Sequence, residues 1–156
     1  MRIRLAMPED VDQLIKMRWD FTLEDEDYDG HINEEDYEEF KNECKQFLLK
    51  AIQGNDWFIW VAEDKGKIVS HIYVELIQKV PRPGRITYPF AYMTNVYTIP
   101  EIRGKGIGGQ LIAKVNEWSK EKKYEFIIVW TSDTSIDFYT RNGYYKNCNE
   151  PMEFIT

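Results

Sequence analysis

The chain has 156 residues, of which 43% are hydrophobic and 15% aromatic, and its formal net charge at pH 7 is −7. The apolar content excludes a disordered chain, and no run approaches the roughly 18 apolar residues of a membrane-spanning helix. The acidic balance argues against nucleic acid as a partner, because backbone phosphates require a basic surface. The length predicts a single domain, residues 1–156, able to bury roughly two thirds of its unfolded surface.

The N-terminus and the cysteines limit the compartment and the cofactors. Met1 is followed by Arg2 and Arg4 instead of an apolar signal-peptide core, so we expect a cytoplasmic protein with no membrane partner. Cys44 and Cys148 have neither a C-x-x-C spacing nor a Cys/His grouping. We therefore expect free thiols and no bound metal.

The first third of the chain predicts one short strand and two amphipathic helices. The strand lies at residues 3–5, and Pro8 suits the first position of the first helix. An acidic loop follows at residues 24–32. Asn33 can cap the second helix, which ends near Gly54. That helix carries apolar residues at spacings of three and four: Tyr37, Phe40, Cys44, Phe47, Leu48, Ala51 and Ile52.

The middle of the chain predicts three strands. Residues 57–63 and 67–80 are strand-like and are separated by the short turn 64–66, so we expect them to pair antiparallel. Two prolines and a glycine within residues 81–84 break the chain. A further strand is predicted at about residues 88–98.

The last third predicts a helix that begins in the glycine-rich segment 103–109. Its apolar face requires a sheet to pack on. Residues 126–130 form a continuous apolar run, typical of a strand covered on both faces, which would lie parallel to the strand at 88–98 through a right-handed crossover. A short helix over 133–142 should end at Gly143, before one or two C-terminal strands.

The acidic residues are unevenly distributed. Residues 20–43 hold twelve acids against one base, whereas the rest of the chain holds 15 acids and 19 bases. One explanation is a solvated helix face. The other is an electrostatic funnel for a cationic substrate, opposite a basic half that binds an anionic cofactor. His31 lies in this window and is assigned no role.

The segment Arg103-Gly104-Lys105-Gly106-Ile107-Gly108-Gly109 is a candidate phosphate-binding loop. Its four glycines leave the backbone open to a ligand, and the helix that follows offers unpaired N–H groups and the positive end of a dipole. Arg103 and Lys105 add two cations beside those groups. The loop therefore suits a multiply charged phosphate better than a carboxylate.

Two common phosphate-binding motifs fit this loop less well. A P-loop requires Ser or Thr after its lysine, but Lys105 is followed by Gly106. The dinucleotide pattern G-x-G-x-x-G is present at Gly104, Gly106 and Gly109, and Asp133 could bind a ribose, although about two thirds of the chain precedes the loop. A small nicotinamide-dependent oxidoreductase thus remains an alternative.

The motif R/Q-x-x-G-x-G/A is matched by Arg103, Gly106 and Gly108, and here the chain resembles the GCN5-related N-acetyltransferases, or GNATs. The resemblance covers about residues 88–145 and includes the segment 138–144. It implies an α/β fold with a mixed, mostly antiparallel central sheet of six to seven strands and about four flanking helices. The fourth and fifth strands would be parallel and splayed apart.

The resemblance also implies a site for acetyl-coenzyme A. In GNATs the glycine loop holds the pyrophosphate, and the end of the fourth strand holds the pantetheine arm. The backbone N–H of Val96 would then polarise the thioester carbonyl. Ser132 stands where the family often has an asparagine. The implied cofactor contacts are Val96, Tyr97, Thr98, Arg103, Gly104, Lys105, Gly106, Ile107, Gly108, Gly109, Ser132 and Arg141.

Two residues are candidates for proton transfer. Tyr139 aligns with the family tyrosine that protonates the departing thiolate, and a phenol that titrates near 10 can do so. Glu75 shares one face of its strand with His71 and Tyr73, and it is the candidate base, with a chain of waters as the alternative. His71 is expected to be a partly buried, hydrogen-bonded side chain.

Together these implications predict transfer of an acetyl group to a primary amine on a small cationic molecule, by direct attack and without a covalent enzyme intermediate. A non-catalytic module that binds or senses coenzyme A is an alternative from a different class. The expected partner is the small-molecule amine. A homodimer could form through apolar C-terminal residues, namely Tyr144, Tyr145, Met152 and Phe154.

Overall fold

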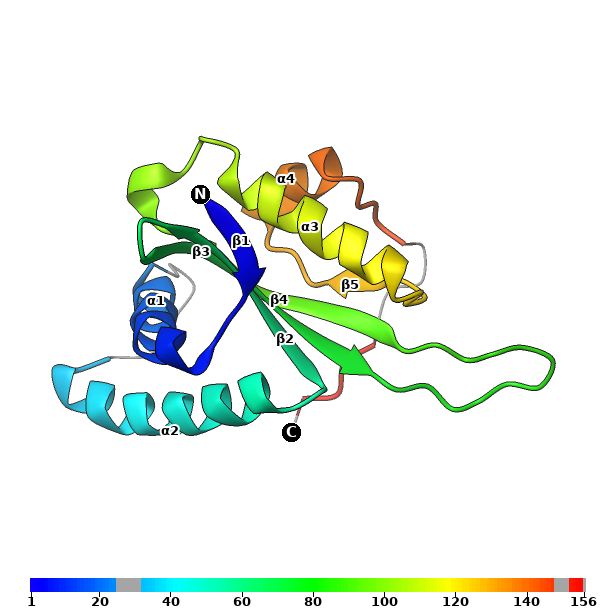
Figure 1. Cartoon of the computed structure of the whole chain (residues 1–156), viewed down its shortest axis with the longest axis horizontal. Helices are drawn as coiled ribbons and strands as arrows, with labels where there is room; N and C mark the ends of the chain where they lie inside the picture. Colours follow the sequence, from blue (N-terminus) through cyan, green and yellow to red (C-terminus); the bar gives the residue numbers. More distant parts are fainter. Residues whose placement is uncertain (25–31, 148–151, 156) are drawn as a thin grey trace.

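A computed structural model describes residues 1–24, 32–147 and 152–155 (Figure 1). The main elements are β1 (Arg2–Leu5), α1 (Val11–Leu23), α2 (Glu34–Gln53), β2 (Trp57–Asp64), β3 (Lys67–Ile77), β4 (Phe90–Thr98), α3 (Ile107–Glu121), β5 (Ile127–Val129) and α4 (Ile136–Arg141). Three short 3₁₀ helices connect them: η1 (Pro8–Asp10), η2 (Pro100–Ile102) and η3 (Asp133–Ser135).

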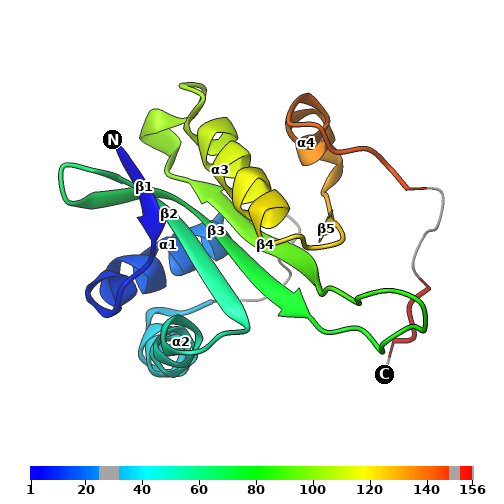
Figure 2. The same ribbon diagram turned by 45° about the vertical axis from the view of Figure 1, so that its right-hand side comes forward.

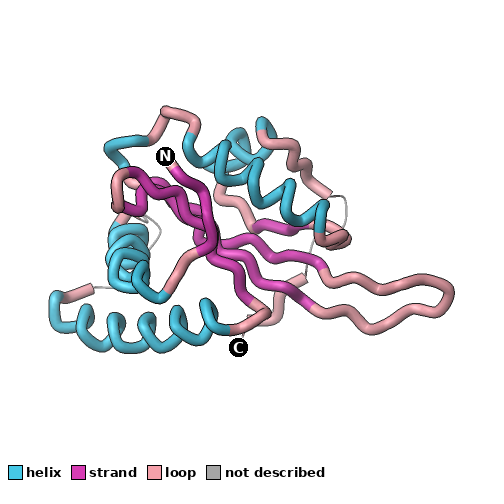
Figure 3. The backbone as a smooth tube through the Cα atoms, viewed as in Figure 1, coloured by secondary structure: helices cyan, strands magenta, loops and turns pink. Residues whose placement is uncertain are grey.

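The strands form one sheet in the order β1-β2-β3-β4-β5 (Figure 3). Neighbouring strands are antiparallel except β4 and β5, which are parallel and joined through α3. The β2–β3 hairpin turns at Lys65 and Gly66, whose φ angles are 50° and 81°. Two consecutive positive φ angles match the right-handed twist of the flanking strands. The predicted hairpin and the predicted parallel pair are thus confirmed.

The predicted number of strands is wrong, because the sheet has five strands in the described part of the chain instead of six to seven. The expected C-terminal strands are absent from residues 144–147 and 152–155. Most apolar side chains there face solvent, with Tyr145 87% and Phe154 90% exposed. Tyr144 alone packs against the core, and one buried side chain does not give a strand the continuous buried face that it needs.

Several predicted boundaries also shift. β3 ends at Ile77 instead of residue 80, and a long loop, residues 78–89, extends away from the sheet (Figure 1). The prolines in this loop lack the N–H that a ladder requires. β5 covers only three residues and is half-buried, so the predicted strand at 126–130, covered on both faces, is too long. The predicted helix at 133–142 is divided into η3 and α4.

Two helices cover each face of the sheet (Figure 2). α1 and α2 cover one face, over a core that includes Leu14, Leu48 and Tyr73. α3 and α4 cover the other face, over a core that includes Val74 and Leu111. Side chains alternate between these two cores along β3, as expected for a strand buried on both faces. Within the described segments, no helix combines the length and apolar content needed to cross a bilayer.

The β4–β5 pairing is short and leaves part of β4 open. Only Ala91, Tyr92 and Met93 pair with β5, whereas β4 continues to Thr98. From Thr94 onward, the edge of β4 on the β5 side has no strand partner among the described residues. The ladder between the two parallel strands therefore ends at Met93.

Candidate active site

The glycine loop needs its glycines for two different reasons. Gly104 and Gly106 have φ angles of 77° and 76°, a region that side chains with a Cβ rarely adopt. Gly108 lies inside the first turn of α3, and a Cβ there would lie 3.2 Å from the Cζ atom of Phe138 on α4. The first two glycines thus allow the turn, and the third lets α3 pack closely against α4.

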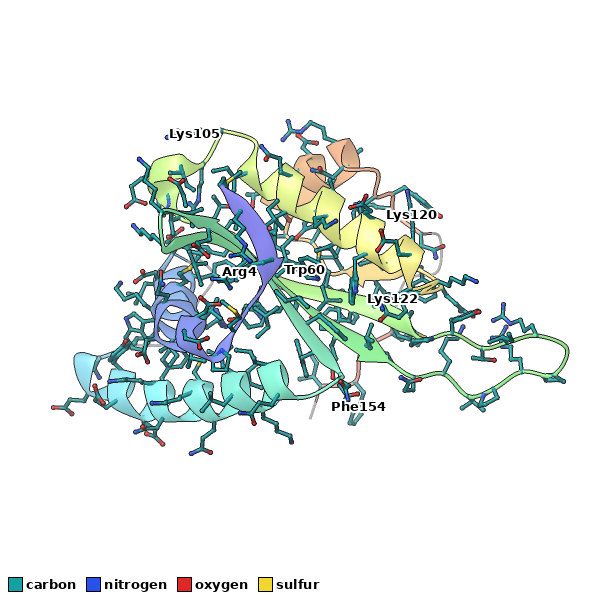
Figure 4. All side chains as sticks on the ribbon, viewed as in Figure 1. Arg4, Trp60, Lys105, Lys120, Lys122 and Phe154 are labelled. Carbon is teal, nitrogen blue, oxygen red and sulfur yellow. The ribbon has the colours of Figure 1, made fainter. Side chains whose placement is uncertain are left out.

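The start of α3 is suited to an anion. Gly106 is the N-cap and has no side chain to occupy the first-turn N–H groups, which an α-helix leaves unpaired. Lys105 is exposed at the loop, pointing away from the sheet (Figure 4), and its Nζ lies 3.4 Å from the carbonyl oxygen of Glu101. Among the described residues no carboxylate forms an ion pair with Lys105. The loop therefore has the free donors and the charge that a pyrophosphate requires.

Arg103 is held at the end of β4. Its Nε donates to the carbonyl of Thr98 at 2.7 Å, and its Nη2 pairs with Glu24 at 2.5 Å. Glu24 also accepts a hydrogen bond of 2.6 Å from the hydroxyl of Tyr97. Burial alone would raise the pKa of Glu24, but the hydrogen bonds from Tyr97 and Arg103 outweigh it and lower that pKa. These contacts join the end of α1 to the glycine loop, which no sequence pattern predicted.

A bulge interrupts β4 next to its open edge. His71 pairs with Tyr97 and Tyr73 with Thr94, so β4 has an extra residue at this point. Asn95 has a φ of 48°, and its carbonyl accepts a hydrogen bond of 2.7 Å from Nδ1 of His71. Because a carbonyl only accepts, Nδ1 must carry the proton. His71 therefore fixes the backbone of the bulge.

His71 is positioned for structure instead of proton transfer. It is fully buried, and burial lowers its pKa to about 4, so the ring is neutral at pH 7. Its Nε2 has no hydrogen-bond partner among the described residues. The expectation of a hydrogen-bonded histidine is confirmed, although the burial is complete instead of partial.

The three strand residues assigned to the cofactor lie on the open edge of β4. Val96 packs against the core beneath α3, and Tyr97 is buried in the core beneath α1. The Oγ of Ser70 on β3 bonds the carbonyl of Tyr97 and the hydroxyl of Thr98, at 2.9 and 2.8 Å. The backbone of β4 is thus held firmly by β3 on one side only.

Tyr139 lies on α4, on the same face of the sheet as α3. It is 7% exposed and packs edge-on against Phe138 and Tyr144, with ring centroids 5.3 and 5.7 Å away. Burial raises its pKa to about 12, so the phenol is protonated at neutral pH. It belongs to the same core as Met93 and Val96 of β4. A proton donor therefore lies on the face where β4 and β5 separate.

Glu75 lies farther along β3, opposite Trp57 of β2 and Tyr92 of β4. It is half-buried on the face covered by α1 and α2, two residues beyond Tyr73. The open edge of β4 begins at Thr94, and Glu75 pairs with the part of β4 before it. Its role as a base stays a prediction.

Ser132 and Arg141 lie on either side of Tyr139 in the sequence. Ser132 is the N-cap of η3, and its Oγ bonds the Oγ of Ser135 at 3.1 Å. Arg141 is exposed in the last turn of α4. Neither contacts the glycine loop through a hydrogen bond or ion pair found in the described residues, and their assignment to the cofactor stays a prediction.

A cavity of about 250 Å³ lies on the face of the sheet opposite Tyr139, between α1, α2 and strands β2 to β4. It reaches the bulge residue of β4, directly before Val96. Sequence reasoning missed it because five separate elements contribute its walls. The lining residues are Arg18, Phe40, Glu43, Cys44, Phe47, Trp57, Tyr73 and Asn95.

The structure accounts for several acids of the window at residues 20–43. Asp20 pairs with Lys16 one helical turn away, and Asp36 accepts a backbone hydrogen bond at the start of α2. Glu43 is exposed but lines the cavity. Residues 25–31, with their acids and His31, lie outside the described residues. The solvated-face explanation thus holds for part of the window.

The described residues contain no group of three His, Cys, Asp or Glu side chains able to hold a metal ion. Cys44 is half-buried, and burial raises the pKa of its thiol to about 11, while Cys148 lies outside the described residues. The nicotinamide alternative requires two parallel βαβαβ halves, which this mostly antiparallel sheet does not contain. Asp133 is exposed in η3.

Comparison with known proteins identifies the family. Residues 16–144 match the model of the acetyltransferase (GNAT) family, and the chain belongs to that family. No curated protein sequence matches the chain significantly.

Solved structures share the fold along nearly the whole chain. A predicted acetyltransferase from Clostridium acetobutylicum, solved with acetyl-CoA, is 23% identical with a TM-score of 0.79, covering 99% of this chain and 95% of that one. An aminoglycoside acetyltransferase from a soil metagenome, in complex with trehalose, is 20% identical with a TM-score of 0.74, covering 99% and 95%. Glucosamine-6-phosphate N-acetyltransferase from Arabidopsis thaliana is 19% identical with a TM-score of 0.67, covering 99% and 98%.

Proposed function

We propose that the protein transfers the acetyl group of acetyl-coenzyme A to a primary amine on a small molecule. The observation that carries this proposal is the position of the anion-binding loop directly after a strand whose edge is open. The first-turn N–H groups of α3 would hold the pyrophosphate. The open edge of β4, from Thr94 to Thr98, would hold the pantetheine arm. Membership of the GNAT family and a neighbouring structure solved with acetyl-CoA support this reading.

The chemistry follows from the groups on each side of this opening. The amine attacks the thioester carbonyl, so a C–N bond forms and the C–S bond breaks. The N–H of Val96 would stabilise the oxyanion that forms between these two steps. Tyr139 would give its proton to the departing thiolate, since burial raises the pKa of its phenol to about 12 and keeps it protonated at neutral pH. The transfer is direct, with no covalent enzyme intermediate.

The amine must lose a proton before or during the attack. An alkylammonium titrates near 10, so it is cationic in solution at neutral pH. Glu75 remains the proposed base, and it lies only a few residues along β3 from the bulge. A chain of waters is the alternative route for the proton. His71 takes no part as a base, since the ring is fully buried and burial lowers its pKa to about 4.

The proposed partner is therefore a small-molecule amine, with no metal and no nucleic acid. Association into a homodimer is also proposed. Met152 and Phe154 are 99% and 90% exposed near the C-terminus, and a second copy would cover them.

Release of free thiol from acetyl-coenzyme A tests the proposal. The purified protein is assayed across amino acids, polyamines, aminoglycosides and peptides, in parallel with Tyr139→Phe. We expect turnover on one class of amine and a fall in kcat of about 10² to 10⁴ in the variant, the usual contribution of a positioned proton donor. Saturable binding of coenzyme A without thiol release on any amine would instead favour a non-catalytic sensing module.

A further inference from the structure

The cavity on the α1–α2 face contains a cation that the described protein leaves unpaired. Arg18 is half-buried in its wall, donates from Nη1 to the hydroxyl of Thr22 at 2.9 Å, and lies 5.5 Å from the centre of the Phe21 ring. No carboxylate among the described residues forms an ion pair with it. A guanidinium presents five donors in a fork that matches a carboxylate. Arg18 is therefore available to an anionic group of a ligand.

The wall of the cavity also holds a buried hydroxyl without a partner. Tyr73 is 3% exposed, and its hydroxyl makes no hydrogen bond in the described part of the chain. Burial raises the pKa of this phenol well above its usual range, so it stays protonated and can donate. A buried polar group of this kind normally has a partner. A ligand with an acceptor group would supply one.

The remaining walls are mostly apolar. Phe40, Phe47 and Trp57 line the cavity, and the last two rings pack edge-on with centroids 5.1 Å apart. The cavity volume of about 250 Å³ lies below the roughly 300–1,000 Å³ of sites for drug-sized ligands. The space therefore fits one apolar group of modest size, and a long polyamine or a multi-ring sugar would extend beyond it.

The charges of the cavity also disfavour a polycation. Glu43 lines it but is exposed, so solvent screens its carboxylate, whereas Arg18 is half-buried among the apolar walls. A second positive charge on the ligand would be repelled by Arg18. One amine at the bulge near Asn95, with a carboxylate near Arg18, gives the complementary arrangement.

We propose that this cavity binds the acetyl acceptor and that the acceptor is a small apolar α-amino acid. Its carboxylate pairs with Arg18 and accepts a hydrogen bond from the hydroxyl of Tyr73. Its apolar side chain packs against Phe47 and Trp57. Its amine lies at Asn95, where β4 opens toward the acetyl group. This assignment rests on the proposed function.

Equilibrium binding tests the assignment without requiring turnover. L-Phenylalanine, phenethylamine, which lacks the carboxylate, glycine, which lacks the apolar side chain, and spermidine are titrated into the protein by calorimetry. We expect phenylalanine to bind about tenfold to 100-fold more tightly than phenethylamine, as a hydrogen-bonded charge implies. Glycine should bind more weakly than phenylalanine. Equal affinity for phenylalanine and phenethylamine, or tightest binding of spermidine, would overturn the assignment.

Variants of Arg18 and Tyr73 attribute the preference to residues. Arg18→Gln should remove the difference in affinity between phenylalanine and phenethylamine, while Arg18→Lys should keep part of that difference. Tyr73→Phe should weaken the binding of phenylalanine and leave the binding of phenethylamine unchanged. Arg85→Gln makes the same charge change at a surface pair with Glu125 and should leave binding unchanged. A thermal melt of each variant establishes that it is folded, and an unchanged preference in a folded Arg18→Gln would contradict the role of Arg18.

The thiol-release assay separates the two proposals. If phenylalanine binds as expected but no amine releases thiol, the assignment of the cavity stands and the proposed function fails. If thiol is released with polyamines and not with apolar amino acids, the function stands and the assignment of the acceptor fails.

Discussion

At the scale of single residues, His71 determines the shape of β4 at the site. The bulge turns the carbonyl of Asn95 away from the regular ladder, and Nδ1 of His71 bonds it inside a fully buried core. An unpaired buried carbonyl would cost about 1–3 kcal/mol. The bulge and its histidine are therefore one structural unit, and they set the position of Val96 that follows.

The buried histidine should make stability depend on pH in a specific range. Its pKa is about 4 in the folded protein and 6.5 when unperturbed, so the unfolded state binds more protons between these values. Its contribution is present above pH 6.5 and is lost as the pH falls toward 4, by about 3 kcal/mol in total. We predict that urea unfolding shows this loss in the native protein.

His71→Asn is the matched control, because its amide can donate near the position of Nδ1 but does not titrate. The difference in unfolding free energy between the two proteins should shrink as the pH falls from 6.5 to 4. A difference that stays constant over that range would contradict the low pKa of His71.

Sequence could identify some site residues and not others. The glycines were predictable, because a run of four before an amphipathic helix has few other uses. Asn95 was a weak signal, since asparagine is uncommon within strands and tolerates positive φ. Arg18 and Tyr73 gave none, because an arginine on a helix and a tyrosine on a strand become a binding pair only after α1 packs onto β3.

At the scale of elements, the contact between α3 and α4 positions the glycine loop. A Cβ on Gly108 would lie 3.2 Å from Phe138, tighter than an ordinary contact. We predict that Gly108→Ala lowers the unfolding free energy by up to about 2 kcal/mol and weakens coenzyme A binding, because an overpacking cost of about 1–3 kcal/mol exceeds the roughly 1 kcal/mol that alanine gains over glycine in a helix. The same substitution in a Phe138→Leu background should cost clearly less, because the neighbouring ring is smaller.

Gly104→Ala provides the comparison within the same loop. A Cβ there meets no atom within 4 Å, but φ is 77°, so its cost should be strain alone, about 1–2 kcal/mol. Phe138→Leu should not relieve it. If Phe138→Leu reduces the cost of both substitutions equally, Gly108 is not required for the close approach of α3 and α4.

The order of the elements was more predictable than their extent. Helix periodicity and the hairpin turn gave the sequence of strands and helices, together with the parallel β4–β5 pair. The C-terminal strands were expected from the family resemblance, and the structure leaves apolar residues there, such as Phe154, exposed. Whether an apolar segment pairs depends on a free edge and a buried face, which are properties of the assembled sheet.

At the scale of the whole molecule, Glu24 connects the N-terminal helices to the glycine loop. Its pair with Arg103 and its bond from Tyr97 span more than 70 positions of sequence. Because Glu24 neutralises a cation beside the proposed pyrophosphate site, Glu24→Gln should increase the affinity for coenzyme A about twofold to fivefold at low salt.

This gain should diminish at high salt, since both side chains are partly exposed. Isothermal titration at two salt concentrations measures it, with Glu38→Gln on the surface of α2 as the control. A weaker affinity in Glu24→Gln at both concentrations would mean that the pair organises the loop instead of competing for its charge.

In the proposed reaction, one opening in the sheet brings the thioester on one face to an amine on the other. Mass spectrometry with acetyl-coenzyme A deuterated in its acetyl group tests this most directly. We expect the labelled acetyl group to appear on the amine of L-phenylalanine, with no labelled acetyl on the protein at any time during turnover. A labelled protein that precedes the labelled amine would contradict direct transfer, and the absence of label on every amine would contradict the proposed activity.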